Sequence, residues 1–197
     1  LKRWNHLHGE SAFVVWISDH GDMNGDHNLW RKGYPWEASS HVNMAMKLPA
    51  ETEATKIAGD QQETATVDSM RSDAIVEIRD VAPTIYDLLG ILDNVTNADP
   101  LINGKSLLPL LQRHSKSVRN HIDLEHSTLY DDRIHWNSIV GRIPENESPN
   151  NNCALYKYIF FAGTGTEQLF CLSKDPLEQQ DMVSNPEYEE ILSLWRN

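Results

Sequence analysis

The sequence predicts an α/β fold followed by a smaller unit built on an antiparallel sheet. Three patterns support this prediction: an apolar run over residues 12–17, an amphipathic helix pattern over residues 80–90, and short strand-like segments after residue 112. The apolar run contains β-branched and aromatic residues, which is typical of a strand buried on both faces of a parallel sheet. The predicted domains are therefore residues 1–112 and residues 113–197.

The helix predicted over residues 80–90 has both a start signal and a stop signal. Asp80 can cap its N-terminus and Gly90 can end it, with apolar positions forming a stripe between them. Residues 102–106 have the composition of a turn, and residues 107–111 form a short apolar segment. This first domain is therefore expected to place a helix against its sheet.

The second domain is predicted to be a small antiparallel sheet with one helix. Its expected strands cover residues 122–125, 134–140, 156–162 and 168–172. The Gly-Thr-Gly-Thr segment at residues 163–166 is typical of a hairpin turn. A helix is expected over residues 186–195, with Asn185 as its cap. Two polar segments, residues 50–73 and 144–152, are predicted to be surface loops.

Composition excludes several classes of function. The chain has 17 Lys and Arg against 29 Asp and Glu, a formal net charge of −12, which argues against nucleic acid as a partner. No apolar run approaches the roughly 20 residues that a membrane span needs. The sequence opens at Leu1 without an initiator Met or a signal-like segment, which suggests that it is part of a longer protein.

The two cysteines can be read as a disulfide or as free thiols. A secreted chain would suit both a disulfide and the sequon at residues 94–96. In the predicted hairpin, however, Cys171 lies opposite about Tyr158, which leaves Cys153 ~17 Å away along the strand. Free thiols are therefore the favoured interpretation.

Polar residues that can bind a metal follow the apolar run directly. Asp19 and His20 open a stretch rich in Asp, His, Asn and Gly, which is typical of a loop at the carboxyl end of a strand. A carboxylate oxygen and an imidazole nitrogen suit a divalent ion, and the nitrogen favours manganese or zinc over calcium. Two ligands are too few, so the others would come from chain outside this sequence or from the substrate.

Two further residues of this loop can take part in catalysis. Lys32, beside Arg31, can hold a sulfuryl or phosphoryl oxygen, and His27 can donate a proton to a leaving group. From the spacing alone, the favoured interpretation of both side chains is that they are solvated loop residues. Asp22 and Asp26 are expected to form turns.

The segment from residue 17 to residue 27, with Lys32 and Glu37, resembles the "SDHGD-x-x-GDH…K…E" segment of sulfatases and phosphonate monoester hydrolases. Further segments resemble other motifs of the same family: residues 80–85 ("D-x-x-PT"), 103–111 ("G-x-SL-x-PLL"), 125–127 ("GEHS"), and 156–159, 167–170 and 175–178 ("KYI…EQLFDLE-x-DP-x-E"). These motifs cover nearly the whole chain in order. On this resemblance the chain is identified as the C-terminal portion of a sulfatase-family member of the alkaline phosphatase superfamily.

The resemblance implies a fold and a site. The fold would be part of an alkaline phosphatase-like sheet flanked by helices, followed by a small α+β domain. Asp19 and His20 would bind a divalent ion, calcium or manganese, and Lys32 would contact the sulfate. The substrate would be a small sulfate ester or a sulfated glycan, and the compartment secreted, periplasmic or lysosomal.

The resemblance also implies that the nucleophile lies elsewhere. The family uses a formylglycine made within a "C/S-x-P-x-R" motif, and neither Cys153 nor Cys171 stands in such a motif. The missing N-terminal half of the same protein would therefore be a necessary partner, and the chain alone is expected to be inactive.

Departures from the motifs keep two alternatives open. His20 stands where many sulfatases carry Asn, which brings the site closer to phosphonate monoester and phosphodiester hydrolases. Residues 41–43 replace the usual "R-V-P", and Cys171 replaces an Asp. The second alternative is a domain without catalytic activity that keeps the fold and binds anions or a partner.

Overall fold

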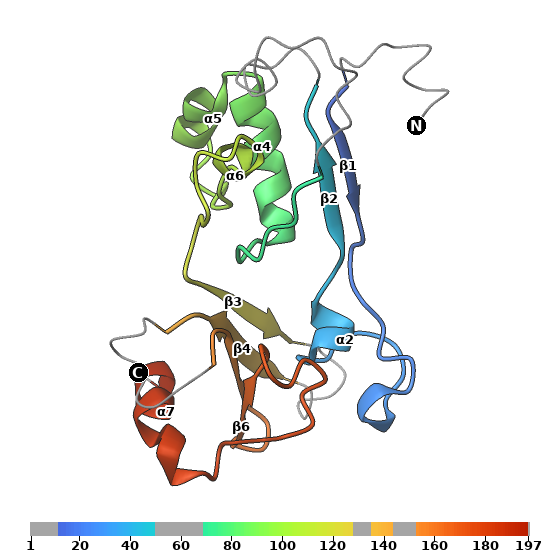
Figure 1. Cartoon of the computed structure of the whole chain (residues 1–197), viewed down its shortest axis with the longest axis vertical. Coiled ribbons are helices and arrows are strands. Elements are labelled where there is room, and N and C mark those ends of the chain that lie inside the picture. The colour runs from blue at the N-terminus through green and yellow to red at the C-terminus, as the bar shows by residue number, and fades with distance from the viewer. Residues whose placement is uncertain (1–11, 50–68, 128–134, 144–152, 197) are drawn as a thin grey trace. The chain divides into compact units, whose positions relative to one another are not determined.

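The computed structural model describes residues 12–49, 69–127, 135–143 and 153–196 (Figure 1). The chain divides into two compact units, one of residues 1–18 and 43–118 and the other of residues 19–42 and 119–197. The sequence-based domains divide the chain after residue 112 instead. The two divisions differ over residues 113–118, which group with the first unit, and over residues 19–42, which group with the C-terminal sheet because they contact it, as detailed below. Residues 50–68 of the predicted loop over residues 50–73, and the whole predicted loop over residues 144–152, lie outside the described residues, whereas residues 69–73 are irregular as expected.

The first unit contains a two-stranded antiparallel ribbon (Figure 1). β1 (Val14–Ile17) pairs with β2 (Met44–Lys47) along its whole length. The strand predicted at the apolar run is confirmed, and among the described residues it pairs with one antiparallel neighbour. Trp16 is 63% exposed. An apolar run favours an extended backbone without fixing the direction of its neighbour, and the sequence signal for β2 was missed.

Three short helices follow in the same unit (Figure 1). They are α4 (Val81–Leu88), α5 (Leu92–Ala98) and α6 (Leu108–Leu111), and α4 packs against both of the others. The predicted helix is thus confirmed as α4, whereas α5 was not predicted. None of the described helices in either unit is long and apolar enough to cross a bilayer.

Asp80 occupies the predicted N-cap position of α4, but its side chain has a role other than capping this helix. A 3-10 turn, η2 (Ile78–Asp80), precedes α4, so Asp80 lies at the end of this turn and its side chain does not cap the helix. Its fully buried carboxylate accepts hydrogen bonds from the backbone N–H groups of Glu77, at 2.9 Å, and Lys105, at 2.7 Å. Asp80 therefore ties the predicted turn at residues 102–106 to the start of the helix.

The second unit is a four-stranded antiparallel sheet with strand order β3-β4-β5-β6 (Figure 1). Its strands are β3 (His121–His126), β4 (Trp136–Gly141), β5 (Tyr156–Phe161) and β6 (Thr166–Cys171). The four predicted strands are therefore confirmed within one or two residues. Residue 134, at the start of one of them, lies outside the described part of the chain.

The two faces of this sheet have different neighbours. On one face Tyr158 and Leu169 pack against Ile191 and Leu192 of α7 (Glu189–Arg196). The turn before this helix is capped by the predicted Asn185, whose side chain accepts a hydrogen bond from the backbone N–H of the second residue after it at 3.1 Å. On the other face lie Val140, Ile159 and Phe170, against which Trp36 packs. The segment between β1 and β2 therefore lies on the sheet face opposite α7.

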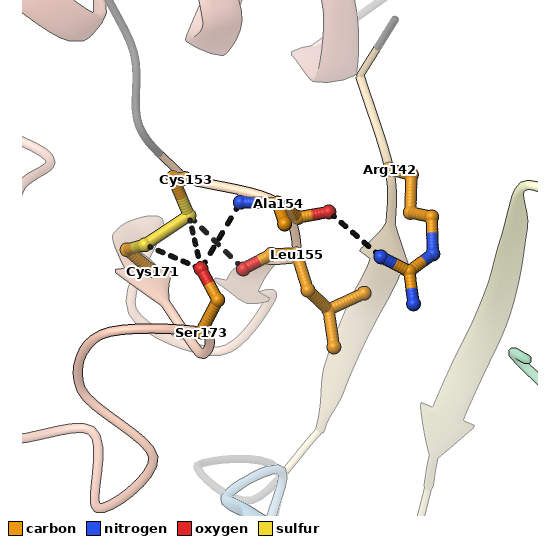
Figure 2. The surroundings of a disulfide bond; sticks show 6 residues. All are labelled: Arg142, Cys153, Ala154, Leu155, Cys171 and Ser173. Atoms are coloured by element: carbon orange, nitrogen blue, oxygen red, sulfur yellow. Dashed lines mark hydrogen bonds between the residues drawn. A yellow bond between two sulfur atoms is a disulfide. The ribbon is translucent and has the colours of Figure 1, made fainter. Parts of the chain in front are cut away.

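Cys153 and Cys171 form a disulfide, so the expectation of two free thiols is wrong. Cys171 pairs with Tyr156, two positions from the predicted partner, and the chain bends at Ala154 rather than continuing as a strand. As a result the two cysteine Cα atoms lie 5.8 Å apart. Figure 2 shows the hydroxyl of Ser173 beside the bond, where it accepts a hydrogen bond from the backbone N–H of Ala154 at 3.0 Å.

We expect the double change Cys153→Ser/Cys171→Ser to lower the free energy of unfolding by about 3 kcal/mol, because the bond restricts the unfolded chain. Denaturant unfolding with and without a thiol reductant measures the loss. Reductant should destabilise the unsubstituted protein by the same amount and leave the double variant unchanged. Two titratable thiols in the unreduced protein would contradict this prediction.

Candidate functional site

The polar segment after β1 forms a loop over residues 18–28, as predicted, and the loop continues to residue 36. It contains one 3-10 turn, η1 (Asp26–Asn28). Six of its residues have a positive φ between 47° and 100°: Asn24, Gly25, His27, Asn28, Arg31 and Gly33. Glycine and asparagine adopt this backbone readily, and histidine does so more often than most residues. The Oδ1 atom of Asp22 accepts hydrogen bonds from the backbone N–H groups of Asn24, at 3.0 Å, and Arg31, at 3.2 Å. The predicted turn-forming role of Asp22 is therefore confirmed.

Asp19 and His20 lie in contact at the start of this loop. The Nδ1 atom of His20 is 2.7 Å from the carbonyl oxygen of Gly21, which can only accept, so Nδ1 carries the hydrogen. In the neutral ring the Nε2 atom then presents a lone pair, and it lies 3.4 Å from the Oδ2 atom of Asp19. The loop thus brings one imidazole nitrogen and one carboxylate oxygen to the same place.

The separation of these two atoms fits a shared divalent ion. Ligand atoms at about 2.0–2.2 Å from one ion lie roughly 3–3.5 Å apart in tetrahedral or octahedral geometry. Hydrogen bonding of Nδ1 to a carbonyl is the usual way of orienting a metal-binding histidine. Within the described residues no group of three His, Cys, Asp or Glu side chains is placed to hold a metal. The pair can therefore supply two ligands, and others would come from outside the described residues.

Gly21 fixes where this pair lies. Its backbone N–H donates to the carbonyl oxygen of Ser39 at 2.9 Å, in α2 (Glu37–Ser40). A Cβ atom at Gly21 would lie 2.1 Å from the carbonyl oxygen of Ala38, so only glycine allows this approach. The backbone that carries the candidate ligands is therefore packed directly on α2.

The other two predicted site residues lie further along the loop. The ring of His27 stacks on Trp36 with centroids 4.6 Å apart, and its buried Nε2 atom has no hydrogen-bond partner among the described residues. Lys32 is exposed. The structure thus gives His27 a fixed ring with an unused nitrogen and leaves the ammonium of Lys32 accessible to an anion.

A buried ion cluster, which was not predicted from the sequence, joins α2 to the four-stranded sheet. Lys157 of β5 is fully buried, and its Nζ atom lies 2.9 Å from Oε1 of Glu37 and 3.0 Å from Oε1 of Glu178. The Oε2 atom of Glu178 accepts a hydrogen bond from the backbone N–H of Glu37 at 2.6 Å. Since a buried charge is costly unless it is paired, these contacts define how α2 sits on the sheet.

His41, for which no partner was predicted, completes this cluster at its exposed side. Its Nδ1 atom lies 2.7 Å from the Oε2 atom of Glu37. Burial alone would raise the pKa of Glu37, but the hydrogen bond with His41 and the charge of Lys157 lower it to about 2. The same hydrogen bond raises the pKa of His41, and burial raises that of Glu178. Glu37 is therefore ionised throughout the physiological range.

These shifts link the cluster to pH in opposite directions. The depressed pKa of Glu37 gives stability that is present above its ordinary value of 4.5 and is lost as pH falls toward about 2. The raised pKa of His41 gives stability that is present below its ordinary value of 6.5 and is lost as pH rises through the raised value. The contacts of Glu37 are thus most favourable at mildly acidic pH.

Comparison with known proteins gives a consistent set of relatives. No family model matches the sequence. The chain is 30% identical to an arylsulfatase of Clostridium perfringens over 186 residues, which cover 94% of this chain and 32% of that protein. It is 28% identical to a choline-sulfatase of Rhizobium meliloti over 177 residues, which cover 90% of this chain and 28% of that protein.

The fold has counterparts among solved structures. A phosphonate monoester hydrolase of Agrobacterium radiobacter superposes with a TM-score of 0.66 at 20% identity, over 99% of this chain and 36% of that one. At this identity the superposition shows the fold alone. It bears out the expected α/β fold with a C-terminal antiparallel sheet, and the chain spans about a third of the length of the relatives that it matches.

Proposed function

Since this chain belongs to the sulfatase family of the alkaline phosphatase superfamily, we propose that it forms the C-terminal portion of a metal-dependent sulfuric ester hydrolase similar to the arylsulfatases. The observation that carries the proposal is the pair of Asp19 and His20, whose oxygen and nitrogen atoms lie 3.4 Å apart with the imidazole tautomer fixed. The disulfide supports the expectation of an oxidising compartment, whether secreted, periplasmic or lysosomal.

In this proposal each loop residue has a chemical role. Asp19 and His20 hold a divalent ion, calcium or manganese, which when bound supplies positive charge against the oxygen atoms of the ester. Lys32 contacts a sulfuryl oxygen and balances the charge that develops on it during transfer. His27 protonates the leaving oxygen. The substrate is a small sulfate ester or a sulfated glycan.

The remaining parts of the site lie outside this chain in the proposal. A formylglycine nucleophile and the other metal ligands come from the N-terminal half of the same protein, so the chain alone has no turnover. The test is hydrolysis of a chromogenic aryl sulfate by the full-length protein, before and after a chelator removes divalent ions. Activity that persists without metal, or activity of the 197-residue chain by itself, would contradict the proposal.

A second candidate function is hydrolysis of phosphonate monoesters or phosphodiesters. It is favoured by His20, which is typical of that branch, and it is compatible with the fold shared with the hydrolase of Agrobacterium radiobacter. A bis-aryl phosphate and an aryl phosphonate, assayed beside the aryl sulfate, decide between the two by their kcat/KM values. A full-length protein that turns over none of the three would instead support a domain that binds anions or a partner without catalysis.

We expect Lys32→Ala in the full-length protein to lower kcat by about 10²–10³-fold, the usual effect of removing one oxyanion contact. The melting temperature should stay unchanged, because the side chain is exposed. Steady-state kinetics and a thermal melt measure the two effects. Lys174→Ala, another exposed lysine of the same unit, is the matched control and should change neither. An unchanged kcat with a large fall in melting temperature would assign Lys32 a structural role.

A further inference from the structure

The backbone on both sides of Lys32 is held while its side chain is exposed. On one side, Arg31 donates its N–H to Asp22 and accepts a hydrogen bond at its carbonyl from the N–H of Met23 at 2.8 Å. On the other side, the N–H of Gly33 donates to Oγ of Ser39 at 3.0 Å. These contacts lie within the loop and α2. They shape the loop but do not connect Lys32 to the sheet.

One hydrogen bond makes that connection. The indole Nε1–H of Trp136, at the start of β4, donates to the carbonyl oxygen of Gly33 at 2.9 Å. This carbonyl belongs to the residue directly after Lys32. A shift of the indole would therefore move Gly33 and, through it, the Cα atom of Lys32.

Trp136 is itself rigidly placed. Its side chain is 6% exposed, and its position in β4 is opposite His126 of β3 and Phe161 of β5. The rings of Trp136 and His126 stack with centroids 5.9 Å apart and planes 26° from parallel. Because residues of both neighbouring strands enclose the indole, we expect the indole to stay in place and its hydrogen bond to fix the position of the loop.

Gly33 is adapted to this contact. Its φ of 93° lies in the region that favours glycine, and a Cβ atom there would lie 3.2 Å from Nε2 of His126. The loop therefore approaches the sheet closely at the residue that Trp136 holds. The ion cluster of Lys157 and Glu37 anchors α2 to the same face of the sheet. Two anchors thus flank the segment from Gly33 to Glu37.

We propose that the four-stranded sheet is a platform that presents Lys32 to the substrate, and that Trp136 is the positioning residue which acts on Lys32 through Gly33. This inference rests on the proposed function, in which Lys32 binds a sulfuryl oxygen. It explains why a sheet that contributes none of the proposed catalytic groups packs against the loop that carries them. An ammonium on a flexible stem gains most from a fixed backbone, because misplacement of the anchoring atom is costly in the chemical step.

The first test is Trp136→Phe in the full-length protein, which removes the indole donor and keeps an aromatic ring. We expect kcat for an aryl sulfate to fall about tenfold, as for the loss of one hydrogen bond, with KM changed less than about twofold. Trp195→Phe makes the same chemical change against the opposite face of the sheet, where the ring packs on Tyr156 and Tyr158. This control should leave kcat within about twofold.

A double-mutant cycle shows whether Trp136 acts through Lys32. In a Lys32→Ala background, Trp136→Phe should lower kcat by less than about twofold, because no ammonium remains to be misplaced. A tenfold fall in both backgrounds would show that Trp136 acts independently of Lys32 and would overturn the proposal. If Trp136→Phe does not fold, Gly33→Ala displaces the same contact and should show the same dependence on Lys32.

Hydrogen exchange separates this proposal from the proposed function. Amides of residues 29–34 and 36 should exchange faster in Trp136→Phe than in Trp195→Phe, whether or not the protein hydrolyses sulfate esters. Equal exchange rates in the two variants would overturn the anchoring role of Trp136. If exchange is faster in Trp136→Phe but Lys32→Ala leaves turnover unchanged, the proposed function of Lys32 is wrong. The positioning role of Trp136 is then wrong as well.

Discussion

Asp19→Ala and His20→Ala should each abolish measurable turnover of the full-length protein and lower its metal content. A bound divalent ion is worth several kcal/mol to the transition state, so losing a ligand is expected to cost on the order of 10³-fold or more in kcat. The carboxylate also balances the charge of the ion, so Asp19→Ala should lower metal affinity as well as rate. Metal analysis of the purified variants and steady-state kinetics on an aryl sulfate measure the two effects.

Two other residues provide matched controls for this pair. His121 and Asp123 are exposed on β3, so His121→Ala and Asp123→Ala remove the same chemical groups away from the loop. Both should keep the metal content and kcat of the unsubstituted protein. If Asp19→Ala and His20→Ala behave like these controls, the loop does not hold the ion and the assignment of the site is wrong.

The loop could be predicted because its composition leaves few alternatives. The residues after β1 include neither an apolar period nor a run of good helix formers, and several of them adopt backbone conformations that suit Gly, Asn and His. The helices that carry clear cap signals were also predictable: Asn185 caps its turn as expected. These features depend on a few neighbouring residues, which is the range over which a single sequence is informative.

The disulfide was not predicted because a small error in strand register changes the expected position of a side chain by several ångströms. The hairpin was shifted by two residues, which displaces Cys171 by ~7 Å along the strand. The bend at Ala154 then brings Cys153 back toward the sheet, and no turn residue in the sequence marks it. Pairing of two thiols depends on distances of a few ångströms, so it could not be settled from expected strand ends.

Two elements had weak local signals. β2 has the sequence Met-Ala-Met-Lys, without a β-branched or aromatic residue, and α5 contains Asp, Asn, Val and Thr, which are poor helix formers. Their structure is set by pairing with β1 and by packing on α4. Tertiary contacts therefore override propensity at both places.

The sequence contains a signal for the ion cluster that was not used in the prediction. Lys157 stands between two tyrosines in an otherwise apolar strand, and a charge at such a position predicts a buried partner of opposite charge. The partners could not be identified from the sequence, because Glu37 lies 120 positions away from Lys157. Glu37, Lys157 and Glu178 each belong to a segment that resembles a sulfatase motif, and the structure brings the three together at one buried point.

Lys157→Met should lower the free energy of unfolding by about 3–5 kcal/mol at neutral pH, because it leaves the buried carboxylate of Glu178 without its counter-charge and leaves the partly buried Glu37 with His41 alone. Methionine has nearly the length of lysine, so loss of packing contributes little. Denaturant unfolding that follows the fluorescence of the second unit measures the loss. Lys174→Met, which removes an exposed ammonium from the same unit, should change stability by no more than about 0.5 kcal/mol.

The pH dependence of this loss distinguishes an uncompensated charge from a packing defect. In the unsubstituted protein the pKa of Glu37 is lowered to about 2, so its stabilising contribution is lost as pH falls below its ordinary value of 4.5 toward 2. Without Lys157, the pKa of Glu178 should rise further and that of Glu37 should rise from about 2, although His41 still opposes the effect of burial on Glu37, so the folded variant gains from protonation as pH falls. The difference in stability between the two proteins should therefore be largest at neutral pH and shrink toward pH 4. A difference that stays constant from pH 7 to pH 4 would show that Lys157 acts by packing alone.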